Sequence, residues 1–202
     1  MQNHFDKVAQ NWDNNPIHKQ RTEAIAKELK KIIPSNNNLT ALEFGAGTGL
    51  LSVAMKDYFL EITLMDSSFE MVKVTNEKIE NEGINNLKIV LFDLEENDYL
   101  ENTFDVIFTQ MSIHHVVDID KIVAKFYKLL NKNGSLVIAD LYEEDGSFHE
   151  KDFKGHLGFN PFLLSQKLTK QGFKEINHYQ CFEIKKTNKP NKYPVFFMWA
   201  KK

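Results

Sequence analysis

Strand-like and helix-like segments alternate along this chain, and that alternation limits the possible folds more than any other feature of the sequence. Short apolar runs that suit buried strands occur at residues 39–44, 60–65, 87–92, 104–109 and 135–141. Segments with helical spacing of apolar residues lie before, between and after them. A repeated strand, helix, strand order predicts a parallel sheet with helices on both faces. We expect a single α/β domain, because this length suits one core.

The helix termini carry recognisable signals. Ser67 and Glu70 have the spacing of a capping box, and Gly83 follows the helix that they would begin. Asp118 precedes a segment with apolar residues at helical spacing, which we expect to end at Asn133 and Gly134. The pattern therefore places helices between the strands, as the alternation requires.

The two ends of the chain add further elements. A helix is expected at 18–33, ahead of the first strand. Near the other end, Asn160 and Pro161 suit the N-cap and first position of a helix that Gly172 closes. Two β-rich runs follow, at 173–184 and 193–200, and the polar segment 185–192 between them reads as a hairpin loop. The sheet should thus have seven strands, mostly parallel, with an antiparallel strand from the C-terminal hairpin.

The segment LEFGAGTGLLS joins the first strand to the next helix and indicates a ligand site. In an open parallel sheet, ligands bind beyond the carboxyl ends of the strands, and the first strand-to-helix turn is a usual contact. Gly45, Gly47 and Gly49 would let a ligand approach the backbone closely. A dinucleotide fingerprint needs a glycine where this chain has Leu50. Glu43 would repel a pyrophosphate and would suit a cation, so a nicotinamide oxidoreductase is disfavoured.

The segment Glu43-Phe-Gly-Ala-Gly-Thr-Gly49 resembles motif I of the class I methyltransferases that use S-adenosylmethionine. FDVIFTQMSIHHV, LNKNGSLVIADL and GFNPFLLSQKLTKQGF are also similar to the corresponding segments of that family. The resemblance implies a Rossmann-like, doubly wound fold and S-adenosylmethionine as cofactor. It implies that Asp66 takes the ribose hydroxyls and Asp93 the adenine amino group. The expected cofactor-binding residues are Glu43, Gly45, Ala46, Gly47, Gly49, Asp66, Ser67, Met71, Asp93, Leu94 and Gln110.

The residue types fit these roles on chemical grounds as well. One carboxylate can accept both hydrogen bonds of a vicinal diol, and a second can accept one from an exocyclic amine. The alternative for Asp66 and for Asp93 is a plain helix N-cap after a strand. The alternative for Glu43 is a solvated strand end. The acids and the glycines together favour a ligand site over these alternatives.

The acceptor side of the site is less well defined. The family places acceptor contacts in the loop after the fourth strand, where His114 and His115 are the candidate catalytic residues. Asp140, at the end of the fifth strand, is expected to face the substrate. A histidine near neutral pKa could take a proton during methyl transfer. The alternative is that one or both imidazoles only shape the loop. His149 and His156 follow in a long polar segment that could contact substrate or simply connect two elements.

No metal is expected at the histidine pair. No carboxylate or cysteine stands at ligand spacing from His114 and His115, and the other histidines look scattered along the sequence.

The N-terminal segment resembles the lid that small-molecule methyltransferases carry. Phe5, Val8 and Trp12 are three and four residues apart, so a short helix would present them on one face. Such a lid would enclose the site, which favours small acceptors over polymers. The alternative is a helix packed on the core away from the site. We therefore divide the chain into a lid at 1–38, a cofactor-binding core at 39–141 and a substrate loop, helix and hairpin at 142–202.

Charge and cysteine content limit the classes of partner and the compartment that we expect for this chain. The net charge of −3 and the pI near 6.2 come from mixed charges, so we expect no broad basic surface for nucleic acid and no nucleic-acid partner. The single cysteine, Cys181, suits a reducing compartment, and we expect a cytoplasmic protein. No apolar window is long enough for a membrane span.

A small-molecule methyltransferase is the leading interpretation. The Asn/Asp-Pro-Pro-Tyr motif of amino methyltransferases is absent. Alternatives are a methyltransferase acting on tRNA or protein, or a binder of S-adenosylmethionine without catalysis. The sequence names neither the acceptor, nor the methylated atom, nor the oligomeric state.

Overall fold

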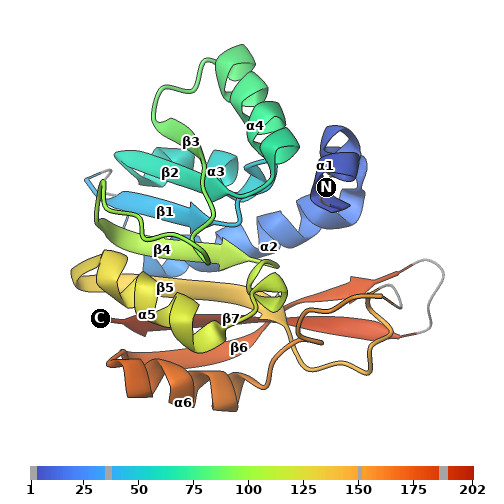
Figure 1. The fold of residues 1–202 in the computed structure, drawn as a ribbon, viewed down its shortest axis with the longest axis vertical. Helices are drawn as coiled ribbons and strands as arrows, with labels where there is room; N and C mark the ends of the chain where they lie inside the picture. Colours follow the sequence, from blue (N-terminus) through green and yellow to red (C-terminus); the bar gives the residue numbers. More distant parts are fainter. Residues whose placement is uncertain (1–3, 35–37, 150–151, 187–190) are drawn as a thin grey trace.

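The computed structural model describes residues 4–34, 38–149, 152–186 and 191–202, and these contain a seven-stranded sheet with the order β3-β2-β1-β4-β5-β7-β6 (Figure 1). Strands β1 to β5 are parallel to one another, and β7 runs antiparallel to both β5 and β6. This confirms the expected mostly parallel sheet with its antiparallel hairpin strand. The strands are β1 (Thr40–Phe44), β2 (Glu61–Asp66), β3 (Leu87–Leu91), β4 (Phe104–Gln110), β5 (Leu130–Leu141), β6 (Lys174–Lys185) and β7 (Lys192–Lys201).

Helices cover both faces of the sheet. The buried residues of α2, α3 and α4 pack in one cluster on one face, and those of α5 and α6 pack in a second cluster on the other. The short α1 lies beside α4 near the carboxyl ends of the strands (Figure 1). The helices are α1 (His4–Val8), α2 (Pro16–Ile32), α3 (Leu50–Met55), α4 (Phe69–Glu82), α5 (Ile119–Leu129) and α6 (Pro161–Gln171), with 3₁₀ turns η1 (Ala9–Asn14), η2 (Lys56–Tyr58) and η3 (Ile113–His115).

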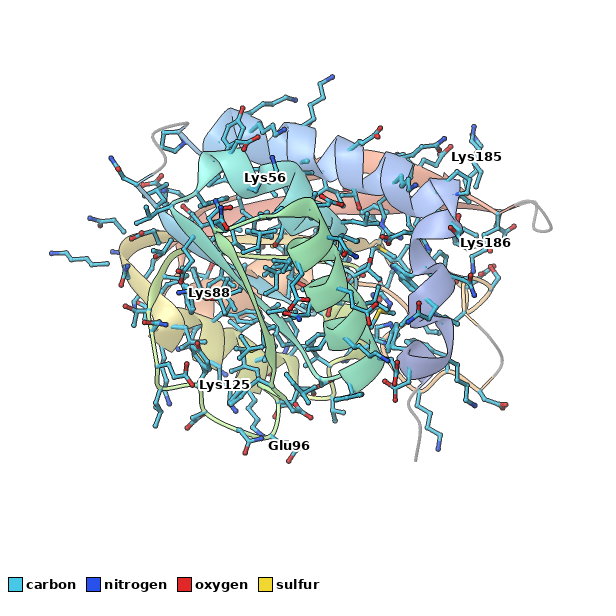
Figure 2. All side chains as sticks on the ribbon, turned by 90° about the horizontal axis from the view of Figure 1, so that it is seen from above. Lys56, Lys88, Glu96, Lys125, Lys185 and Lys186 are labelled. Carbon is cyan, nitrogen blue, oxygen red and sulfur yellow. The ribbon has the colours of Figure 1, made fainter. Side chains whose placement is uncertain are left out.

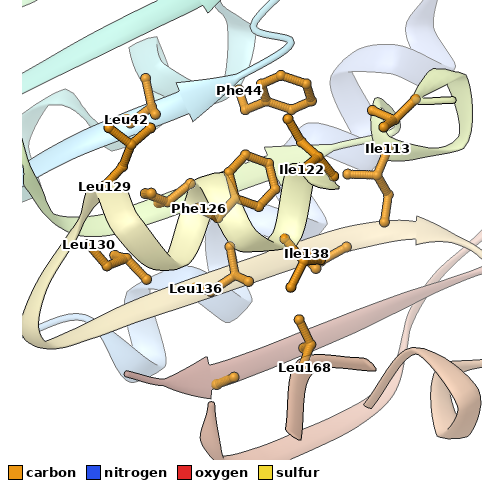
Figure 3. Packing of buried hydrophobic residues seen from close by; sticks show 14 of the residues in the cluster. Leu42, Phe44, Ile113, Ile122, Phe126, Leu129, Leu130, Leu136, Ile138 and Leu168 are labelled. Carbon is orange, nitrogen blue, oxygen red and sulfur yellow. The ribbon is translucent and has the colours of Figure 1, made fainter. Parts of the chain in front are cut away.

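Apolar side chains from distant parts of the chain meet between the sheet and α5 (Figure 3). Phe44 at the end of β1 meets Phe126 of α5 edge to face, with ring centroids 5.2 Å apart. Ile138 of β5 and Leu168 of α6 extend the same cluster, and both are fully buried. This packing fixes the end of β1, from which the glycine-rich turn begins.

The N-terminus of α4 differs by one residue from the sequence expectation. The N-cap is Ser68 rather than Ser67, and its hydroxyl oxygen accepts a hydrogen bond from the backbone N–H of Met71 at 3.2 Å. Two adjacent serines offer the same capping chemistry, so the sequence could not decide between them. Ser67 is thereby left at the turn, where it lines the cavity described below.

The segment after Asp118 also ends earlier than expected. Asp118 caps α5 as predicted, but α5 ends at Leu129 rather than at Asn133. The reason is that Leu130 already pairs with Phe104 of β4. Asn133 instead takes a positive φ of 64° within the long strand β5.

The last helix follows its sequence signals. Asn160 caps α6 through its side chain, Pro161 is the first helical residue, and Gly172 ends the helix with a positive φ. In the predicted hairpin loop at 185–192, residues 187–190 lie outside the described residues.

Lysine side chains on several elements lie apart from one another rather than in one cluster. Lys56, Lys88, Lys125 and Lys185 belong to four separate elements and are well separated in Figure 2. Across the described ranges, the structure contains no helix that is long and apolar enough to cross a membrane.

Candidate functional site

A cavity of about 350 Å³ opens beyond the carboxyl ends of β1, β2, β3 and β4. Its walls come from the N-terminal segment, the glycine-rich turn, the residues after β2 and β3, and the loop after β4. The sequence-predicted residues that line it are Phe5, Trp12, Gly45, Ala46, Gly47, Asp66, Ser67, Met71, Asp93, Leu94, Gln110 and His115. The predicted residues Glu43, Gly49, His114 and Asp140 do not line it.

The glycines of the turn serve different purposes. Gly45 and Gly47 line the cavity with positive φ values of 63° and 54°. A Cβ atom on Gly45 would lie 1.8 Å from the hydroxyl oxygen of Ser112, so a side chain at this position would collide with the loop after β4. Gly49 was predicted to contact the cofactor, but it is the N-cap of α3, where a Cβ atom would lie 2.8 Å from Leu64. Its role is to let α3 pack closely on β2.

Glu43 points away from the cavity, which corrects the expectation that it faces the ligand. Its side chain is fully buried and turns toward α3, where Oε2 accepts hydrogen bonds from the Ser52 backbone N–H (3.1 Å) and hydroxyl (2.5 Å). The alternative of a solvated strand end is also wrong. Burial raises the pKa of Glu43 to about 8, although the Ser52 hydrogen bonds oppose this.

Asp66 lies at the cavity wall and also holds the glycine-rich turn. Its Oδ2 accepts a hydrogen bond from the Gly47 N–H at 2.7 Å, and its Oδ1 accepts one from the Ser68 N–H at 2.8 Å. Burial raises its pKa, and the backbone hydrogen bonds act in the opposite direction. The carboxylate therefore links the ends of β1 and β2 at the point where a ligand would enter.

Asp93 occupies the corresponding place after β3. It lines the cavity, and its Oδ1 accepts hydrogen bonds from the N–H groups of Glu95 (2.9 Å) and Glu96 (3.3 Å). Neither acid caps a helix, because Ser68 is the N-cap of α4 and no helix lies between β3 and β4, a segment that the structure describes in full. The alternative of a plain helix N-cap is therefore wrong, and both acids make local turn contacts while they line the cavity.

Phe5 and Trp12 cover the cavity from the N-terminal segment. Their ring centroids lie 6.0 Å apart, and Phe5 also meets His115 edge to face at 4.9 Å. The segment consists of the short helix α1 and the 3₁₀ turn η1 rather than of one continuous helix. Asn15 then ends it by capping α2. The alternative, in which this segment packs away from the site, is wrong.

Two carboxylates that the sequence analysis did not single out anchor this segment. Asp6 accepts a hydrogen bond from the Ser68 hydroxyl at 2.6 Å. Asp13 accepts one from the Thr48 hydroxyl and one from the Lys78 ammonium group, both at 2.6 Å. The anchors therefore join the N-terminal segment to the glycine-rich turn and to α4. Only their positions directly after Phe5 and Trp12 could have indicated this role.

His114 and Asp140 form a buried pair behind the cavity wall. His114 Nδ1 and Asp140 Oδ1 lie 2.6 Å apart, and the His114 backbone N–H donates to Asp140 Oδ2 at 3.2 Å. Asp140 was predicted to face the substrate, but it is fully buried at the end of β5. Of the predicted histidines, His115 is the one that lines the cavity.

A third histidine lies beside this pair. The ring centroid of His149 is 5.0 Å from that of His114 and 3.6 Å from that of Phe153, on which it stacks. The expectation that the remaining histidines are scattered is therefore wrong for His149, which the fold brings back from the segment after β5. Among the described residues, no group of three potential ligands is arranged to hold a metal ion.

Arg21 is a cavity residue that the sequence analysis missed. It lines the cavity with 6% of its surface exposed. Burial lowers its pKa to about 10. The sequence signal was present, because Arg21 stands four residues before Ile25 and eight before Leu29, on the apolar stripe of its helix.

Comparison with known families gives a match to one family model over slightly less than half of the chain. Residues 42–138 match the model of a methyltransferase domain. An uncharacterized methyltransferase of Schizosaccharomyces pombe is 33% identical over 120 residues, which are 56% of this chain and 42% of that protein. A sterol 4-C-methyltransferase of Caenorhabditis elegans is 26% identical over 122 residues, or 60% of this chain and 36% of that protein. The chain thus spans less than half the length of these relatives.

Solved structures of other proteins share the fold of this chain. A methyltransferase from Haloferax volcanii, solved in complex with the Trm112 methyltransferase activator, superposes with a TM-score of 0.78 at 14% identity, over 100% of this chain and 98% of that chain. A methyltransferase from Bacillus halodurans gives a TM-score of 0.72 at 16% identity, over 87% and 97% of the two chains.

Proposed function

We propose that this chain, whose residues 42–138 match the model of a methyltransferase domain, is a class I methyltransferase that transfers a methyl group from S-adenosylmethionine to a small molecule. The observation that carries the proposal is the covered cavity at the strand ends. It combines a glycine-rich turn and the carboxylates of Asp66, Asp93 and Glu95 with aromatic residues from the N-terminal segment. Such a site suits a nucleoside cofactor and leaves limited room for a polymer.

The residues of the cavity fit the cofactor. Asp66 is proposed to accept hydrogen bonds from the ribose hydroxyls and Asp93 from the adenine amino group. Gly45 and Gly47 would let the cofactor lie against the backbone of the turn. A structure of a phosphoethanolamine methyltransferase from Haemonchus contortus, which shares this fold, contains S-adenosylhomocysteine. The bound cofactor supplies an electrophilic methyl group on a sulfonium ion.

The acceptor is proposed to bind under Phe5 and Trp12, next to the loop after β4. The lid would exclude water from the site of transfer. His115 is the residue proposed to accept a proton from a hydroxyl or amine, because it stands at the cavity wall. His114 is proposed to position this loop through its pair with Asp140. A cytoplasmic location stays a prediction from the sequence.

Isothermal titration calorimetry with S-adenosylmethionine, S-adenosylhomocysteine and NAD tests the cofactor assignment. We expect binding of the first two ligands and none of NAD, because the turn lacks the dinucleotide fingerprint. Binding of NAD with no response to S-adenosylhomocysteine would sink the proposal. A screen for transfer of tritiated methyl groups to a metabolite panel, with total RNA and protein in parallel, then tests the acceptor class. Labelling of RNA or protein alone would contradict a small acceptor.

A further inference from the structure

The connection between β3 and β4 has no helix or strand of its own, although its first residues line the cavity. Residues 92–103, all of which the structure describes, lie in turns and irregular structure. They carry the chain from the edge strand β3 past β2 and β1 to β4. Asp93, Leu94 and Glu95 belong to this connection and to the cavity wall. Their position must therefore be fixed by contacts with another element.

Lys125 of α5 makes these contacts. Its ammonium group donates hydrogen bonds to the backbone carbonyl oxygens of Leu94 and Asn97, both at 2.7 Å, and to that of Glu95 at 3.3 Å. The carboxylate of Asp98 lies 3.2 Å from the same nitrogen. An ammonium group has three N–H donors, so these four oxygens use its full capacity. The start of the connection is thus folded around one side chain.

Lys125 occupies a place on α5 that suits an apolar side chain. It stands three residues after Ile122 and four before Leu129, on the buried stripe of the helix, and only 8% of its surface is exposed. Burying a cation there is costly unless its donors are paired. An apolar residue would pack equally well on this stripe but would offer no donor to the carbonyl oxygens. The hydrogen bonds to the connection are what distinguish a lysine at this position.

The same contacts fix the direction of the Asp93 side chain. Oδ1 of Asp93 accepts hydrogen bonds from the N–H groups of Glu95 and Glu96, and its carbonyl oxygen accepts one from the Asn97 N–H at 3.0 Å. Glu95 and Asn97 are also the residues whose carbonyl oxygens Lys125 holds. The orientation of the Asp93 carboxylate therefore depends on Lys125, although Lys125 itself does not line the cavity.

Building on the proposed function, we propose that Lys125 is a positioning residue that gives the cavity its preference for adenine among the possible bases of the cofactor. It acts through Asp93. By fixing the turn after β3, it holds the carboxylate where the amino group of the base can donate a hydrogen bond to it. Without Lys125 this turn would take several conformations, and the part of the affinity that depends on the amino group would fall. The contacts at the ends of β1 and β2 would remain.

Calorimetry with two ligands that differ only in the base tests this inference. S-Inosylhomocysteine carries an oxygen where S-adenosylhomocysteine carries the amino group. We expect the wild-type chain to favour S-adenosylhomocysteine on the order of 10- to 100-fold, the usual range for a hydrogen bond to a charged group. Lys125→Met keeps the length of the side chain and removes the donors, so it should reduce this preference roughly 3-fold or more. Lys125→Gln should restore part of it, because an amide can still donate to the carbonyl oxygens.

Lys121→Met is the matched control, because Lys121 lies on the exposed face of the same helix. It should leave both affinities unchanged. Retained binding of S-inosylhomocysteine by Lys125→Met would also show that this variant is folded. If the wild-type chain binds neither ligand, the cofactor assignment fails and this inference with it.

Other outcomes would overturn the inference and leave the cofactor assignment standing. One is equal affinity of the wild-type chain for the two ligands. Another is an unchanged preference in Lys125→Met, or an equal loss of affinity for both ligands, because a purely structural role would not act on the base alone. If neither Lys125 variant folds, the lysine serves the stability of the whole domain and does not select the base.

Discussion

Glu43 carries a buried carboxyl group whose ionisation is costly in the folded chain. Its ordinary pKa of 4.5 is raised to about 8, with burial as the largest cause. Between these values the unfolded chain loses this proton while the folded chain keeps it. The free energy of unfolding therefore falls as the pH rises through this window, by at most about 1.4 kcal/mol per pH unit from this group. Below pH 4.5 and above pH 8 the contribution to the slope disappears.

Glu43→Gln tests this effect, because glutamine keeps an oxygen that can accept from Ser52 but does not ionise. We expect the variant to gain stability relative to the wild-type chain as the pH rises from 5 to 8, in the absence of cofactor. Urea unfolding at several pH values measures the difference. Asp66, whose pKa is also raised, is present in both proteins, so its contribution cancels. Parallel stability curves for the two proteins would show that Glu43 is already ionised in the folded state.

At the scale of elements, the N-terminal segment depends on polar anchors for its position over the cavity. Asp13 joins η1 to the Thr48 hydroxyl and to Lys78 of α4, and the ion pair is partly buried, with side-chain exposures of 29% for Asp13 and 17% for Lys78. We expect Asp13→Ala to weaken binding of S-adenosylhomocysteine roughly 3- to 10-fold, which corresponds to the net value of one or two hydrogen bonds. The melting temperature should change little, because the sheet and its two core clusters do not contain this residue.

Stopped-flow dissociation of S-adenosylhomocysteine is the measurement for the anchor, since a loosened lid should release the ligand faster. Asp57→Ala provides the control. It removes an ion pair with Lys56 whose carboxylate side is 82% exposed, and neither residue lines the cavity. Equal dissociation rates for Asp13→Ala and the wild-type chain would mean that the segment does not act as a lid.

The elements themselves could largely be predicted from the sequence, because apolar periodicity and capping residues are local signals. The order of strands and helices, the glycine-rich turn and the caps at Asp118 and Asn160 all follow from neighbouring residues. The direction in which a side chain points could not be predicted in the same way. Glu43 turns toward α3 because Ser52 is there, and that contact depends on how the helix packs. The motif alone therefore singled out Glu43, but the prediction that its carboxylate faces the ligand was wrong.

Contacts between residues far apart in the chain account for most of what the sequence missed. Asp140 lies 26 residues after His114, and the parallel pairing of β4 and β5 brings their ends together. Arg21 reaches the cavity only because α2 packs against the end of β4, a contact between residues 88 positions apart in the case of Thr22 and Gln110. No pattern of neighbouring residues indicates such contacts. They can be inferred only when the order of the strands in the sheet is known.

At the scale of the whole molecule, the cavity is the place where elements from the first 116 residues meet. Its walls take residues from the N-terminal segment, α2, the ends of β1, β2 and β4, the segment after β3, and α4. These parts lie on both faces of the sheet, and along the chain they extend from Phe5 to Val116. A ligand in the cavity would therefore contact elements that must separate when the chain unfolds. Its binding free energy should add to the stability of the folded chain as a whole.

S-Adenosylhomocysteine should consequently raise the melting temperature of the entire domain in one transition. A ligand at 100 times its dissociation constant adds about 2.7 kcal/mol of stability. For a chain of this size, each kcal/mol shifts the melting temperature by about 2–4 °C, so a shift of roughly 5–11 °C is expected. Differential scanning calorimetry measures it, with NAD at the same concentration as the control. Separate transitions, of which only one responds to S-adenosylhomocysteine, would show that the C-terminal hairpin and α6 unfold independently of the cavity. No shift at saturating ligand would remove the basis for placing the cofactor there.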